Sequence, residues 1–160
     1  MIRNLLAATL LGAALSAGAQ STPAANFTDM WFNPAESGWG VSFAQHAGTN
    51  QVFAVWYTYD PREVGTAGQF KPIWFVMPGG TWVDPNTITG AAYVANGVPF
   101  NQAGSNPQNN PVGTFRFTFT NAGSGQFSYN IAPPAGLLPS DPAYNLPTLS
   151  GTKNIVRQSF

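Results

Sequence analysis

Three acidic residues near predicted strand ends could do chemistry together: Glu36, Asp60 and Glu63. Two carboxyl groups that flank an aromatic cleft can hydrolyse a glycosidic bond, one as general acid and the other as base or nucleophile. A glycoside hydrolase that uses Glu36 with Asp60 or Glu63 is therefore one hypothesis. Acids beside turns more often hold the turn in place. For Glu36 we expect this structural role, with the carboxylate accepting hydrogen bonds from exposed backbone N–H groups.

A second set of residues could bind a ligand without transforming it, and we favour this reading. Aromatic rings are stacking platforms for a sugar face or an apolar molecule, and a polar uncharged loop at 96–111 suits a neutral ligand. The protein is then expected to be non-catalytic, without a cofactor. The alternative is a structural component of an extracellular assembly, whose aromatic surface is buried against a protein partner at the cell surface. The predicted ligand-binding residues are Tyr57, Tyr59, Trp82, Trp31, Glu36 and His46.

Composition argues against several other functions. The 160 residues contain six basic and six acidic side chains, so no positive surplus exists to neutralise the phosphates of a nucleic acid. Neither of the glycine-rich nucleotide-binding motifs occurs. His46 is the only histidine and the chain has no cysteine, so a transition metal would lack its usual ligands. We therefore expect no metal site, no nucleic-acid partner and no disulfide.

The elements that position these residues read as strands, because apolar and polar residues alternate with a period of two between Gly-, Pro- and Asn-rich turns. Residues 115–120 and 127–131 form the clearest hairpin, with all their aromatic rings on one face. We predict an all-β fold of about eight antiparallel strands in a meander that closes into a small barrel, with a β-sandwich as the alternative. The other predicted strands span 27–32, 38–46, 51–59, 73–77, 87–95 and 151–158.

The central hairpin pairs residues 38–46 with residues 51–59. If His46 faces Gln51, large residues lie opposite smaller ones almost throughout, and a one-residue slip would bury polar groups. This register places Tyr57 opposite Gly40 and Tyr59 opposite Gly38. The face that carries Trp39 and Trp56 is then the core, and the tyrosine face is a partly wet surface.

The first nineteen residues resemble a secretory signal peptide. Arg3 is followed by an apolar stretch from Leu5 to Ala17, which is too short to span a bilayer, and small residues precede an expected cleavage near Ala19. We therefore expect a secreted or periplasmic protein with one all-β domain over residues 20–160 and no membrane span in the mature chain.

The stretch Trp31-Phe32-Asn33-Pro34-Ala35-Glu36-Ser37-Gly38-Trp39-Gly40 resembles the opening motif of a poorly characterised family of secreted proteobacterial all-β domains. The resemblance implies a secreted β-domain, without implying a reaction or catalytic residues. The chain departs from the family pattern at 61–72, which is longer than the expected tight turn. Further similarity lies at 53–60, 74–75, Gly113, Phe117, Phe119, 127–129 and 155–160.

Overall fold

The computed structural model describes residues 20–63, 65, 69–94, 97–104 and 110–159. The predicted signal peptide and its cleavage point near Ala19 lie outside this part of the chain, and the predicted loop at 96–111 lies partly outside it. The described residues form strands and no helix, so none of them forms a helix that could cross a membrane. The strands are β1 (Asp29–Phe32), β2 (Gly40–Gln45), β3 (Val52–Tyr59), β4 (Pro72–Met77), β5 (Thr81–Asp84), β6 (Thr87–Val94), β7 (Pro111–Asn121), β8 (Ser124–Ile131) and β9 (Leu149–Arg157).

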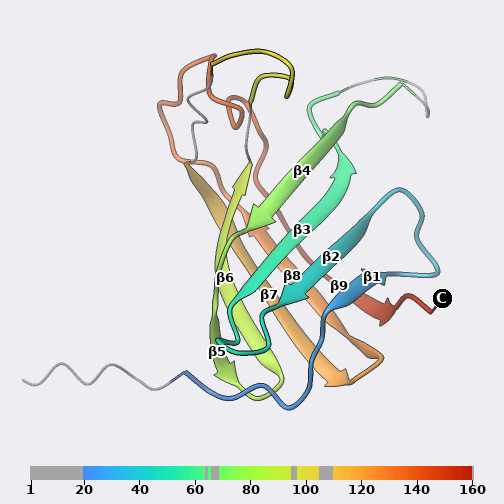
Figure 1. The fold of residues 1–160 in the computed structure, drawn as a ribbon. Helices are drawn as coiled ribbons and strands as arrows, with labels where there is room; N and C mark the ends of the chain where they lie inside the picture. Colours follow the sequence, from blue (N-terminus) through green and yellow to red (C-terminus); the bar gives the residue numbers. More distant parts are fainter. Residues whose placement is uncertain (1–19, 64, 66–68, 95–96, 105–109, 160) are drawn as a thin grey trace, which may run out of the picture.

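Eight of these strands form a closed antiparallel barrel, which confirms the predicted fold class (Figure 1). The strand order is β4-β3-β2-β1-β9-β8-β7-β6, and pairing of β4 with β6 closes the ring. Neighbours in sequence are neighbours in the barrel, apart from β5, which pairs only with β6 and lies outside the ring. Strand β5 was not predicted, because its four residues are too few to show a clear alternation of apolar and polar side chains.

The interior of the barrel is filled mainly by aromatic side chains. Phe115, Phe117 and Phe119 point inward from β7, as their alternation with polar residues predicts, and are buried. Phe27 enters from the chain segment before β1 and stacks on Phe119, with ring centroids 3.9 Å apart. A buried aromatic ring contributes about 1.5–3 kcal/mol by leaving water, so this packing supplies a core without any disulfide.

The predicted register of the β2–β3 hairpin is confirmed over residues 40–45 and 52–57. Gly40 pairs with Tyr57, Val41 with Trp56 and Phe43 with Ala54, and the backbone N–H of His46 donates to Gln51. As predicted, Trp56 is buried and the tyrosine face is outside. Trp39, which the prediction also placed on the core face, is only partly buried. Since one face is dry, a slip of one residue would exchange the two faces, which fixes this register.

Candidate functional site

The outer face of β3 and β4 carries exposed aromatic rings. Tyr57 is 39% exposed and Tyr59 is 52% exposed, while Trp74 on β4 is 60% exposed. Strand pairing sets their order, because Tyr57 pairs with Gly40 on one side and with Trp74 on the other. The pairing of β3 with β4 therefore places Tyr57 and Trp74 side by side on the solvent-exposed face.

These rings form a small groove of about 260 Å³, which we call the aromatic groove. The planes of the Tyr57 and Trp74 rings are nearly perpendicular, at 74°, and their centroids are 6.4 Å apart. A ligand could therefore stack on the face of one ring and contact the other ring at its side. None of the lining residues is charged, which favours a neutral ligand. The lining consists of Gly38, Trp39, Gly40, Tyr57, Thr58, Tyr59, Pro72 and Trp74.

Gly38 leaves room for the rings. Its φ of +89° is one that other residues rarely adopt, and a Cβ atom there would lie 3.3 Å from the Tyr59 ring. The glycine therefore sets both the turn into β2 and the depth of the groove beside Tyr59.

Glu36 is hydrogen-bonded to Trp39, one of the residues that line the groove. Its carboxylate accepts hydrogen bonds from Asn33 Nδ2 at 3.1 Å, Trp39 Nε1 at 3.1 Å and Lys153 Nζ at 2.7 Å. The hydrogen bond from Lys153 is the main cause that lowers the pKa of Glu36. The donors are side chains, whereas the sequence led us to expect backbone N–H groups. Glu36 thus fixes the turn and orients Trp39, and it is not among the residues that line the groove.

His46 lies at the other end of the hairpin from Tyr59. Its Nδ1 accepts hydrogen bonds from the backbone N–H groups of Gly48 and Thr49, both at 3.2 Å, so it organises the β2–β3 turn. It lines a different hollow, beside Phe53 and Pro78. The structure therefore does not bring His46 together with the aromatic groove.

Trp31 and Trp82 are not exposed stacking platforms, and this part of the prediction is wrong. Each is 1% exposed, and each indole N–H donates to a backbone carbonyl, of Phe27 and Asn50 respectively. Trp31 pairs with Val41, which faces the core, so it faces the core too. Sequence reasoning missed Trp74, because the run 73–77 is apolar at every position and its faces cannot be told apart without a partner strand.

The three acids of the hydrolase hypothesis are each paired with a cation of their own. Glu36 binds Lys153, Asp60 binds Arg62 and Glu63 binds Lys71. The pKa values of Glu36 and Asp60 are lowered, in each case chiefly by a hydrogen bond from the paired cation. A general acid in glycoside hydrolysis needs a raised pKa, so this environment does not favour that role for either residue. The described residues also contain no cluster of three or more potential metal ligands.

Comparison with protein-family models, with curated proteins and with solved structures found no match to this chain.

Proposed function

We propose that this protein is a secreted or periplasmic, non-catalytic β-domain that binds a neutral carbohydrate in the aromatic groove. The observation that carries the proposal is the exposed Tyr57–Trp74 pair at a right angle in an uncharged groove. A sugar ring has an apolar C–H face that stacks on an aromatic ring and hydroxyls at its edge that hydrogen-bond. Tyr57, Tyr59 and Trp74 offer both kinds of contact.

The carbohydrate is favoured over a small apolar molecule because the rings are half exposed. An apolar ligand gains most of its affinity by being enclosed, whereas these rings would cover only part of it. The signal-peptide-like leader and the resemblance to secreted proteobacterial domains support an extracytoplasmic location. The hydrogen bonds that engage Glu36 and Asp60 support a binding role over a catalytic one.

The test is retention on neutral polysaccharides, with an affinity measured by tryptophan fluorescence. We expect Trp74→Ala and Tyr57→Ala each to weaken binding at least about tenfold, the effect of a hot-spot residue. Phe53→Ala is the matched control, because Phe53 is an exposed ring of the same strand but does not line the groove. Near-ultraviolet circular dichroism checks that each variant is folded.

Two results would contradict the proposal. Binding that both groove variants leave unchanged would place the carbohydrate elsewhere. Failure of the wild-type protein to retain any neutral polysaccharide, together with self-association or capture of a protein through the Phe53 side of the same face, would favour the assembly alternative.

A further inference from the structure

A second hollow lies where the barrel wall opens. Strands β4 and β6 pair only through Phe75 with Val94 and Val76 with Tyr93. β6 ends at Val94, and the first residues of β4 lean away from it (Figure 1). The opening is filled by one end of the β3–β4 connection and by part of the β8–β9 connection, residues 132–148, and a hollow of about 560 Å³ remains between them. We call it the seam hollow.

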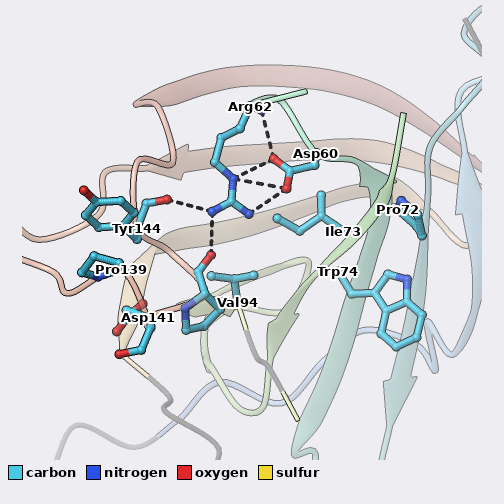
Figure 2. Close-up of a pocket in the computed structure, with 11 residues that line it drawn as sticks. Asp60, Arg62, Pro72, Ile73, Trp74, Val94, Pro139, Asp141 and Tyr144 are labelled. Carbon is cyan, nitrogen blue, oxygen red and sulfur yellow. Dashed lines mark hydrogen bonds and ion pairs between the residues drawn. The ribbon is translucent and has the colours of Figure 1, made fainter. Parts of the chain in front are cut away.

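The seam hollow has an apolar floor and polar walls (Figure 2). Ile73 and Val94 are buried at its base, and polar groups come from the two connections above them. This combination of an apolar surface with a few fixed polar groups is typical of sites for small organic ligands. The lining consists of Asp60, Arg62, Pro72, Ile73, Trp74, Val94, Pro139, Ser140, Asp141, Pro142 and Tyr144.

Its polar groups are held in place before any ligand arrives. The Arg62 guanidinium donates to both oxygens of Asp60, with Nε–Oδ1 at 2.8 Å and Nη2–Oδ2 at 2.7 Å. Its Nη1 donates to the carbonyls of Pro142 and Tyr144, at 2.9 and 2.8 Å. This clamp joins the two connections. A ligand that binds there need not order these side chains, and this lowers the entropic cost of binding.

Two acidic residues and one guanidinium line the seam hollow. Asp60 neutralises Arg62, and the buried Asp141 carboxylate accepts hydrogen bonds from Asn110 Nδ2 and from the backbone N–H of Ala143. Two carboxylates against one guanidinium disfavour an anion, while carboxylate oxygens remain good acceptors for hydroxyl groups. The chemistry therefore suits a neutral polyhydroxylated ligand, like that of the aromatic groove.

The seam hollow and the aromatic groove adjoin, because Pro72 and Trp74 line both. In Figure 2 the Trp74 ring lies on the far side of Ile73 from the Arg62 guanidinium, and Trp74 is also a lining residue of the aromatic groove. Resting on the proposed function, we infer that the carbohydrate is a chain of at least two linked units, which crosses Trp74 and places consecutive units in the groove and in the seam hollow.

The experiment measures affinity against chain length. The probes are glucose, mannose and N-acetylglucosamine, each with its β-1,4-linked di-, tri- and tetramers. For the sugar that binds, we expect the wild-type affinity to rise at least about tenfold from the monomer to the trimer. Pro139→Trp should fill the seam hollow from its exposed rim and bring trimer affinity down to that of the monomer, with monomer binding unchanged. Pro134→Trp makes the same change elsewhere in the β8–β9 connection and is the control.

The outcomes separate this inference from the proposed function. Binding that Trp74→Ala removes, but that is independent of chain length in the wild-type protein, overturns the two-site inference and leaves the groove proposal standing. Trimer binding that Pro139→Trp leaves at the wild-type level also overturns it. If no sugar of any length binds the wild-type protein, both the proposed function and the inference are wrong.

Discussion

At the scale of single residues, the structure assigns a physical role to most residues of the stretch Glu36-Ser37-Gly38-Trp39-Gly40. Glu36 holds Trp39 and Lys153, Gly38 makes the turn and leaves space for Tyr59, and Gly40 lies opposite Tyr57. The stretch therefore builds one wall of the aromatic groove. Its acid, Glu36, is engaged by side-chain hydrogen bonds and does not line the groove, whose lining residues are uncharged.

Replacement of Gly38 tests this reading. Gly38→Ala should destabilise the protein by about 1–2 kcal/mol, because alanine is strained at a positive φ, and should also weaken carbohydrate binding, because its Cβ pushes on the Tyr59 ring. Urea unfolding and fluorescence titration measure the two effects. Gly136→Ala is the control, since Gly136 also has a positive φ but no neighbour within reach of a Cβ. Equal losses of binding in the two variants would show that strain alone is responsible.

At the scale of elements, the Asp60–Arg62 pair ties the β3–β4 connection to the β8–β9 connection. The hydrogen bond from Arg62 is the main cause that lowers the pKa of Asp60, so the folded protein keeps this carboxylate charged at a lower pH than the unfolded chain does. The pair therefore stabilises the fold above the ordinary aspartate pKa of about 3.9, and this contribution is lost as the pH falls through the lowered value.

We predict that wild-type protein is more stable than Asp60→Asn near neutral pH and that the difference shrinks as the pH drops below about 4. Urea unfolding of both proteins between about pH 7 and pH 2 measures the difference in the free energy of unfolding. Since Glu36 is present in both proteins, its own titration cancels in the difference. A difference that stays constant across this range would mean that the ion pair does not titrate as proposed.

The strands also show what the sequence could predict and where it could not. Alternation in β7 and β8, and the matching of large with small residues between β2 and β3, were enough to predict elements, faces and register. The aromatic groove was half predicted. Tyr57 and Tyr59 lie in the predicted β2–β3 hairpin, whose two faces differ in polarity. Trp74 lies in a run that is apolar at every position, and only its pairing with Tyr57 shows which way its side chain points. The seam hollow depends on where β6 ends and how two connections meet, which no local pattern encodes.

At the scale of the whole molecule, the barrel separates two populations of aromatic residues. Phe117, Trp31 and Trp82 belong to the buried core, while Tyr57 and Trp74 are exposed on the outer face of the barrel. A ligand that reached the interior would have to displace well-packed rings, each of which contributes free energy to folding. Binding is therefore expected on the outer wall and at its seam, with the interior unchanged.

The most direct measurement follows the indole N–H signals of the five tryptophans by nuclear magnetic resonance during titration with a neutral oligosaccharide. A Trp74→Phe variant assigns the signal of Trp74. We predict that the Trp74 signal shifts with carbohydrate concentration and that the signals of Trp31 and Trp82 stay in place. A Trp74 signal that does not move while the Trp31 or Trp82 signal shifts would contradict the proposed site, because the carbohydrate would then bind at the buried core.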